Sequence, residues 1–211
     1  MQKWHIPQSA PQRVAVLLFD GFSNLCLANA VEPLRVANTL AGRRLYDWQF
    51  VTLDGVGVAS SSGLPVAPEG RLRDHPGGDA LFVLPGYGVR DHVAQAVRPL
   101  RAAAARFDVL VGLDMGSWLF AAAGLLDGRR AAVHRDEVTA LAEAFPGVTV
   151  VENRFVRDGP LLTCGGALAA HDLVLDMIAR RHGAAAVAVL GHPQPDDQTR
   201  RALQDGRDQR R

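Results

Sequence analysis

The stretch that decides the fold is Phe107-Asp108-Val109-Leu110-Val111-Gly112-Leu113-Asp114-Met115-Gly116. An apolar run that leads into G-x-(residue)-x-G and then into a small apolar helix is typical of a nucleophile elbow. In such an elbow the glycines relieve crowding around one residue, which is held in a strained turn above a sheet. The central residue is normally Ser or Cys, but here it is Asp114. The pattern therefore predicts the architecture of a catalytic site without its usual nucleophile.

The segments around this stretch alternate between expected strands and expected helices. Continuous apolar runs predict strands that are buried on both faces, and apolar residues at helical spacing predict helices. The alternation favours an α/β sandwich with a mostly parallel sheet. The expected strands are 14–19, 48–53, 80–84, 109–113 and 148–151, with a hairpin at 155–157 and 161–163; the expected helices are 24–40, 90–106, 117–123, 136–145 and 167–180; short strands or loops are expected over the Gly-, Ser- and Pro-rich residues 55–78.

Three of the expected strands stop abruptly, at Asp20-Gly21, Pro85-Gly86 and Gly112–Gly116. Ligands of open α/β folds bind at the carboxyl ends of the strands, so we expect these turns to converge on one pocket. Gly86 is expected to let backbone amides face that pocket, as in an oxyanion hole.

The composition is that of an ordinary globular domain. The chain has 211 residues, of which 48% are hydrophobic and 21% charged. Its net charge is +1, so no overall positive electrostatic potential favours nucleic acid as a partner. We find no signal peptide and no apolar run long enough to span a membrane. Two distant cysteines, Cys26 and Cys164, and the lack of HExxH or CxxC motifs predict no metal and no cofactor. A reduced, cytoplasmic location is the default expectation.

The two ends of the chain differ from its centre. Residues 1–12 are polar and are expected to form a flexible arm, 13–190 the folded domain, and 191–211 a polar tail. The positive charge of the five arginines in residues 192–211 is nearly cancelled by four aspartates, which disfavours DNA binding by this tail. The tail also lacks the apolar periodicity of a DNA-reading helix pair.

Several dispersed motifs resemble a known superfamily. The elbow, Leu84-Pro85-Gly86 and His134, twenty residues after Asp114, resemble the ThiJ/PfpI group of the class I glutamine-amidotransferase-like fold. Residues 21–38, 123–129 and Thr163-Cys164-Gly165-Gly166 are similar to the amino-terminal sensor domain of AraC-type transcriptional regulators, among them regulators of choline, betaine and carnitine use. The resemblance covers residues 13 to 190. It implies a flavodoxin-like three-layer sandwich, a homodimer, and DNA binding only through a carboxy-terminal domain that is absent from this sequence.

The resemblance also implies which positions carry catalysis in other members. There the elbow holds a Cys nucleophile, an acidic residue from the loop after the first strand bonds it, and a His stands nearby. These places are taken here by Asp114, Cys26 and His134, respectively. A second carboxylate beside Asp114 would raise one pKa steeply, and a thiol avoids that conflict while staying protonated. We therefore expect no catalytic residue.

A buried carboxylate is better suited to recognition. Asp114 is expected to be stabilised as an anion by the dipole of the following helix and to pair with a cationic ligand, with aromatic and thioether side chains adding cation–π and soft contacts. Two alternatives remain open: Asp114 caps that helix, and His134 is a satisfied core or surface group. The expected ligand-binding residues are Asp114, Met115, His134, Cys26, Gly86, Tyr87, Trp118 and Phe22.

Three functions are compatible with these features. The favoured hypothesis is a non-catalytic domain of an AraC-type regulator that senses a small cationic or amino-acid-like metabolite. The alternative is a ThiJ/PfpI-type enzyme, a hydratase or amidase-like hydrolase, that uses Asp114 or Cys26. A scaffold without any ligand is the third.

Overall fold

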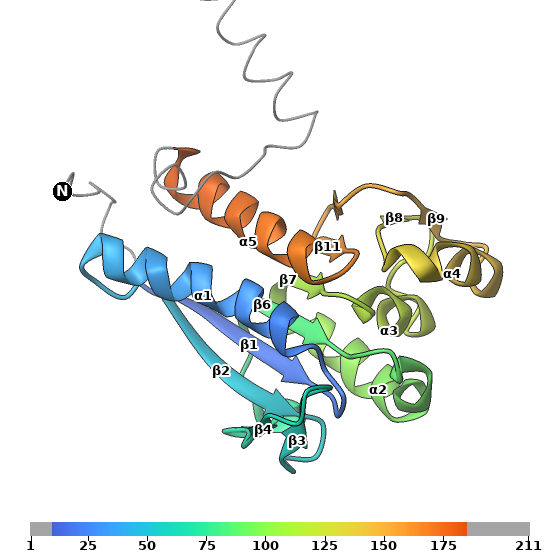
Figure 1. Ribbon diagram of the computed structural model, residues 1–211, viewed down its shortest axis with the longest axis horizontal. Coiled ribbons are helices and arrows are strands. Elements are labelled where there is room, and N and C mark those ends of the chain that lie inside the picture. The colour runs from blue at the N-terminus through green and yellow to red at the C-terminus, as the bar shows by residue number, and fades with distance from the viewer. Residues whose placement is uncertain (1–9, 185–211) are drawn as a thin grey trace, which may run out of the picture.

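A computed structural model of the chain describes residues 10–184. These residues form a three-layer α/β sandwich (Figure 1) around a sheet with strand order β10-β11-β7-β6-β1-β2-β5. Its neighbouring strands are parallel except for β10, which runs antiparallel to β11. The expected fold class is confirmed. The strands are β1 Gln12–Leu18, β2 Tyr46–Thr52, β5 Gly70–Arg71, β6 Gly78–Leu84, β7 Phe107–Gly112, β10 Phe155–Asp158 and β11 Leu161–Cys164.

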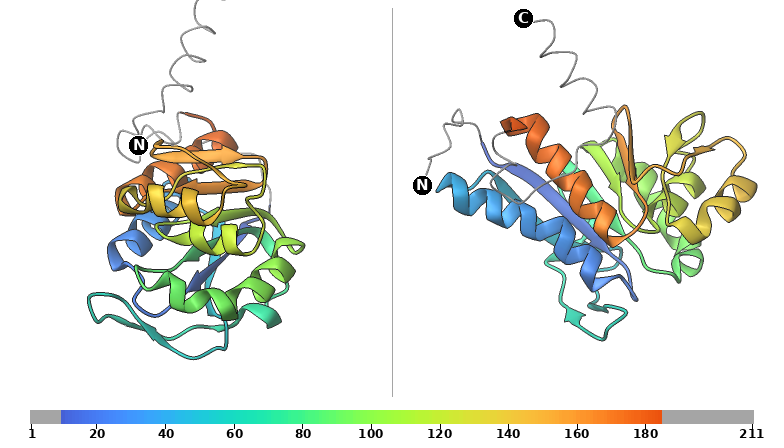
Figure 2. Two further views of the ribbon diagram at one scale, coloured as in Figure 1. Left: turned by 90° about the vertical axis from the view of Figure 1, so that its right-hand side faces the viewer. Right: turned by 45° about the horizontal axis from the view of Figure 1, so that its top comes forward.

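Helices cover both faces of this sheet (Figure 2). Helices α1 (Asn24–Ala41) and α5 (Ala167–His182) lie side by side on one face. Helices α2 (Val89–Ala104) and α3 (Gly116–Ala122) pack against the other face. Strand β1 shows why both layers are needed, because its even-numbered residues from Val14 to Leu18 join the core under α1 and α5, while Ala15, Leu17 and the following Phe19 join the core under α2 and α3. Burial on both faces accounts for its continuous apolar sequence.

Helix α1 is defined by local signals at both ends. The Ser23 side chain accepts a hydrogen bond from the backbone amide of Cys26 at 3.2 Å, which satisfies one of the donors left open at a helix start. Gly42 ends the helix in the left-handed region with φ of 63°. The helix is tied to α5 by the Asn29 side-chain amide, which donates to the Ala167 carbonyl at 2.9 Å. Because α1 begins where β1 ends, Cys26 is placed at the carboxyl edge of the sheet.

A smaller subdomain lies beyond β11, at the right of Figure 1. It contains a two-stranded sheet of β8 (Arg130–Ala131) and β9 (Thr149–Val150), the 3-10 turn η2 (Arg135–Glu137) and helix α4 (Val138–Ala144). The strand expected over 148–151 is present as the shorter β9, but it pairs with β8 and not with the main sheet. The single helix expected over 136–145 is divided, because the His134 carbonyl accepts from the Glu137 amide and closes a 3-10 turn first. The expected hairpin is confirmed as β10–β11.

The residues between β2 and β6 form only short elements, as predicted. These are the hairpin strands β3 (Val58–Ala59) and β4 (Pro65–Val66), strand β5 and the 3-10 turn η1 (Leu72–Asp74). The hairpin is held against the end of β1 by backbone hydrogen bonds from Gly21 to Ala59 and from Ser61 to Phe22, both 2.8 Å.

The predictions for the two ends of the chain are mostly untested. Residues 1–9 of the expected arm and the whole tail 191–211 lie outside the described residues. Within residues 10–184 no helix is both long enough and apolar enough to cross a membrane.

Candidate functional site

The elbow predicted at Gly112–Gly116 is present. Asp114 has φ of 56° and is the only non-glycine residue with positive φ among residues 10–184. A Cβ on Gly116 would lie 2.7 Å from the Val83 carbonyl oxygen, and one on Gly112 would lie 3.0 Å from the Phe120 ring. The left-handed conformation costs an L residue about 1–2 kcal/mol, so the surrounding packing must hold Asp114 in place.

The strand-end turns converge, as predicted. The Leu113 amide donates to the Val83 carbonyl at 3.0 Å, which ties the elbow to the end of β6. A Cβ on Gly86 would lie only 2.1 Å from the Gly21 carbonyl oxygen, so the turns after β6 and β1 are in direct backbone contact. In the same way, a Cβ on Gly165 would lie 2.3 Å from the Val133 carbonyl oxygen. Close backbone approach is thus the structural reason for glycine at 86 and 165.

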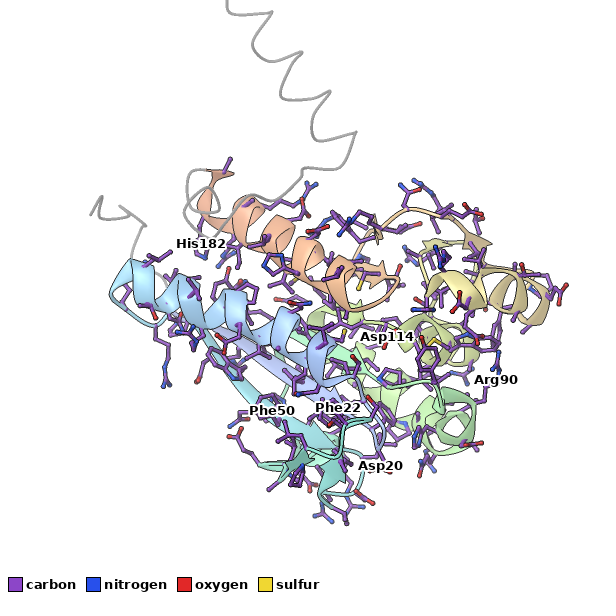
Figure 3. The ribbon with its side chains drawn as sticks, in the orientation of Figure 1. Asp20, Phe22, Phe50, Arg90, Asp114 and His182 are labelled. Carbon is purple, nitrogen blue, oxygen red and sulfur yellow. The ribbon has the colours of Figure 1, made fainter. Side chains whose placement is uncertain are left out.

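The carboxylate of Asp114 is buried and unpaired. It lies near the amino end of α5, whereas His182 marks the far end of that helix (Figure 3). Asp114 is only 6% exposed, and no hydrogen bond to its side chain occurs within residues 10–184. Burial raises the pKa of Asp114 above its ordinary value, and the nearby His134 partly offsets this.

Two expectations about Asp114 are corrected by this geometry. The helix-capping alternative is wrong, because the N-cap of α3 is Met115 and no side chain caps it. The expected stabilisation of the anion by the helix is also outweighed, since burial of a carboxylate favours its neutral form. The protein therefore keeps a carboxylate where its ionisation is disfavoured.

Two thiols flank the Asp114 carboxylate. Cys26, from the first turn of α1, and Cys164, from the end of β11, are both fully buried. The backbone amide of Asp114 lowers the pKa of the Cys164 thiol, but by less than burial raises it. Burial is the main reason why the pKa of Cys26 is raised well above its ordinary value and that of Cys164 is raised to about 12, and the charge of Asp114 contributes to both shifts. Both side chains are consequently held as neutral thiols, which are poor nucleophiles.

Sequence reasoning did not assign Cys164 to the site. The signal that places it there is its position in Thr163-Cys164-Gly165-Gly166, at the end of the strand that pairs with β7. No group of three or more His, Cys, Asp or Glu side chains within the described part of the chain is arranged to hold a metal ion.

His134 and Tyr87 form the exposed side of the site. The Tyr87 hydroxyl and His134 Nε2 are 3.3 Å apart, and the two rings meet edge to face at 5.4 Å. Tyr87 is 65% exposed. Partial desolvation by its neighbours and the charge of Asp114 raise the pKa of its hydroxyl. A Cβ on Gly166 would lie 3.3 Å from Cδ2 of His134, so the turn before α5 packs against the imidazole. These contacts join His134 to Tyr87, and both residues lie near enough to Asp114 to interact with it electrostatically.

A second contact runs beside the Tyr87–His134 pair. The guanidinium of Arg90, at the start of α2, binds the Glu137 carboxylate at 2.6 Å. Both contacts join the segment from the end of β6 to the start of α2 with η2 and the residue before it. Neither Arg90 nor Glu137 was singled out in the sequence. Arg90 is labelled beside the Asp114 site in Figure 3.

The apolar residues expected around a ligand lie deeper than expected. Phe22 is fully buried under α1 and α5, and Met115 is fully buried under α2 and α3. Trp118 is 6% exposed, and the guanidinium of Arg90 lies 4.3 Å from its ring centre. The ring face that was expected to receive a ligand cation is thus covered by a cation of the protein itself.

Comparison with known proteins agrees with this architecture. The family model described as DJ-1/PfpI family matches residues 12–180. The chain is 40% identical over 174 residues to the HTH-type transcriptional regulator GbdR of Pseudomonas aeruginosa, covering 82% of this chain and 47% of that protein. It is 42% identical over 168 residues to the HTH-type transcriptional regulator CdhR of the same species, covering 79% and 50%.

A solved structure is similar over the whole fold. A crystal structure of an AraC family transcriptional regulator from Pseudomonas putida superposes with a TM-score of 0.77 at 26% identity, covering 84% of this chain and 96% of that one. The chain spans about half the length of GbdR and CdhR. With its elbow, its strand order and a family match from residue 12 to residue 180, the chain belongs to the DJ-1/PfpI family.

Proposed function

We propose that this chain is the small-molecule-sensing, non-catalytic domain of an AraC-type transcriptional regulator. Its ligand is a small cationic or amino-acid-like metabolite whose positive charge pairs with Asp114. The observation that carries the proposal is the Asp114 carboxylate, which is buried without a hydrogen-bond partner in a strained backbone conformation. An unpaired buried acid is costly to keep, and strained, unsatisfied groups concentrate at functional sites.

The neighbours of Asp114 favour binding over chemistry. The thiols of Cys26 and Cys164 are held protonated by burial, so neither supplies a thiolate nucleophile. They also offer only weak hydrogen bonds to the carboxylate, so its charge is left for a ligand to compensate. A cation at this place would contact Asp114 and, on the exposed side, His134 and Tyr87.

Relatives supply the regulatory part of the proposal. GbdR and CdhR are HTH-type transcriptional regulators of about twice the aligned length, and the solved AraC family protein shares the fold. We infer a homodimeric, cytoplasmic regulator in which DNA is bound by a further domain. Ligand binding alters regulation because the ligand has different affinities for two arrangements of the protomers or of that domain.

A thermal-shift screen tests ligand sensing. The panel contains betaines, carnitine, amino acids and opines. A ligand at 100 times its Kd stabilises the native state by about 2.7 kcal/mol. This stabilisation should raise the midpoint of a domain of this size by roughly 5–10 °C. Asp114→Asn should abolish the shift, whereas the matched control Asp108→Asn, an exposed carboxylate in the strand that leads into the elbow, should retain it.

The enzyme alternative has a distinct outcome. Turnover of an amide, an aldehyde or an isonitrile that is lost in Asp114→Asn or Cys26→Ala would show that the site is catalytic and would overturn the proposal. A ligand whose shift survives Asp114→Asn would separate sensing from the elbow and would equally refute the proposed role of Asp114.

A further inference from the structure

A groove with two hollows lies at the other side of the molecule, along the edge of the sheet. The larger hollow has a volume of about 570 Å³ and is formed by β2, β5 and the residues after η1. A smaller hollow of about 180 Å³ continues it toward the start of β1 and β2. Gln49, His75 and Pro76 line both hollows. Strands β1 and β6 separate the β2 and β5 end of the groove from β7 by about 14 Å across the sheet. At the other end of the groove His75 lies against Phe107, at the start of β7, whereas the elbow follows the far end of that strand, about 16 Å along it.

His75 is the built-in donor of this groove. It is 9% exposed, and its ring stacks on Phe107 with the ring centres 5.4 Å apart. His75 Nδ1 accepts a hydrogen bond from the Gly77 amide at 3.0 Å, so the neutral ring carries its proton on Nε2. No partner for Nε2 occurs within residues 10–184. Nε2 is open to solvent at the wall of both hollows, so it can donate a hydrogen bond to a ligand that enters the groove.

The side chain of Arg106 holds the segment that carries His75 in place. The guanidinium of Arg106 donates to the Leu72 carbonyl at 3.1 Å and also to the His75 carbonyl. Burial and the charges of Arg106 and Arg13 lower the pKa of His75, so its ring stays neutral near pH 7. The donor is consequently fixed in position and in protonation state before any ligand arrives.

The unpaired charges of the groove have opposite signs at its two ends. Arg13 lines the small hollow beside His75, and its side chain makes no ion pair among the described residues. Asp54 and Glu69 line the large hollow. Each of these acids uses one oxygen to accept a backbone amide, at 3.0 Å and 3.1 Å respectively, and neither is ion-paired. The remaining acid of the large hollow, Asp74, is neutralised by Arg71 at 2.6 Å.

The strand register sets the separation of these charges. Arg13 lies opposite Asp47, and Gly70 lies opposite Val51, which places Glu69 level with Phe50. Three residues along a strand correspond to about 10 Å. A ligand that reaches both ends must therefore be elongated.

We propose that this groove is a second ligand site, which takes an elongated zwitterion with its carboxylate at Arg13 and His75 and its ammonium group at Glu69 and Asp54. The site does not depend on the sensing role of Asp114. A compound with both charges at the ends of an aliphatic chain fits this arrangement, whereas a compound with only one charge leaves one end of the groove uncompensated.

The test uses 6-aminohexanoate as the probe, with hexanoate and hexylamine as single-charge controls. Titration is followed by the ¹H–¹⁵N signals of the His75 ring and by calorimetry. We expect saturable binding of the zwitterion, at least about tenfold tighter than that of either control. His75→Asn should weaken it by roughly tenfold, because asparagine Oδ1 can still accept the Gly77 amide while the Nε2 donor is lost.

Further variants keep the outcome unambiguous. Glu69→Gln retains the acceptor for the Phe50 amide but removes the charge, so it should weaken 6-aminohexanoate about as much as His75→Asn and leave hexanoate unchanged. Asp108→Asn, an exposed carboxylate of β7 that lines neither hollow, should bind the probe as the unmodified chain does. Equal affinity for all three compounds, no binding of the probe, or unchanged binding in both His75→Asn and Glu69→Gln would each overturn the proposal.

Discussion

Replacing Asp114 by asparagine is expected to stabilise the folded domain at neutral pH by about 1–2 kcal/mol, although it removes the group that we propose to bind the ligand. Asparagine has nearly the same shape as aspartate and tolerates the left-handed backbone that φ of 56° requires. The substitution therefore changes the charge and little else. Because the native carboxylate has no hydrogen-bond partner in the described structure, no bond to it is lost.

The size of the effect follows from the environment of the carboxylate. Asp114 is 94% buried, and an unsatisfied buried polar group costs about 1–3 kcal/mol. The positive charge that His134 can carry offsets part of this cost. We therefore do not expect the stabilisation to reach about 3 kcal/mol, the upper end of this range. For a domain of 150–250 residues, a gain of 1–2 kcal/mol corresponds to a rise of roughly 2–8 °C in the melting temperature.

The stabilisation should depend on pH in one direction. Burial raises the pKa of Asp114 in the folded state, so ionisation of this carboxylate opposes folding. The cost is absent below the unfolded-state pKa of about 3.9, develops as pH rises through the folded-state value, and is constant above it. The advantage of the asparagine variant over the unmodified chain should shrink accordingly as the pH is lowered toward 4.

Urea denaturation between pH 4 and pH 8 measures this difference. Asp158→Asn is the matched contrast, because the backbone amide of Arg130 and the side chain of Arg129 hold the pKa of Asp158 below its ordinary value. That variant should lose stability at neutral pH, and its deficit should fade as the pH falls through the folded-state pKa of Asp158. A destabilised Asp114→Asn, or a gain that is the same at pH 4 and pH 8, would refute the reasoning.

Two further substitutions test the scaffold of the site. Gly86→Ala places a Cβ 2.1 Å from the Gly21 carbonyl oxygen and should cost about 1–3 kcal/mol in thermal or urea unfolding, whereas Gly70→Ala, with no atom within 4 Å of its Cβ, should be close to neutral. Asn38→Ala should cost about 2–3 kcal/mol, because the Asn38 amide makes three hydrogen bonds of 2.7–2.9 Å with the backbone of residues 45–46. Unchanged stability in Gly86→Ala would contradict the close approach of the turns after β1 and β6. Unchanged hydrogen exchange at residues 45–46 in Asn38→Ala would contradict the role of the Asn38 side chain in holding the backbone at the start of β2.

Much of the fold could be predicted because its signals are local and strong. The apolar run of β1, the serine and glycine at the ends of α1 and the glycine-flanked turn at Asp114 each correspond to one element of the structure. The segment from 136 to 145 shows where such signals fail. Its helical pattern does not reveal the hydrogen bond between the Glu137 amide and the His134 carbonyl, which divides it into η2 and α4.

The candidate site was predicted in part. The ends of parallel strands were sufficient to place the elbow with Asp114 at one edge of the sheet, and the family resemblance added Cys26 and His134 to it. The sequence was not sufficient for Trp118, which was expected to contact a ligand cation but instead packs under Arg90 from another element. Nor does the sequence reveal that the Asp114 backbone lies beside the Cys164 thiol, since fifty residues separate the two.

The sequence by itself determined the fold class, the strained turn and the presence of one acid at its centre, because strand and helix periodicity and glycine placement act over a few residues. Only the tertiary structure determined the environment of that acid. Its burial, its lack of hydrogen bonds and the protonated thiols beside it arise where α1, β11 and the elbow meet. The same holds for the groove at β2 and β5, whose opposite charges come from segments that pair only in the folded sheet. Desolvation and charge pairing depend on distances across the fold, and these are fixed by packing.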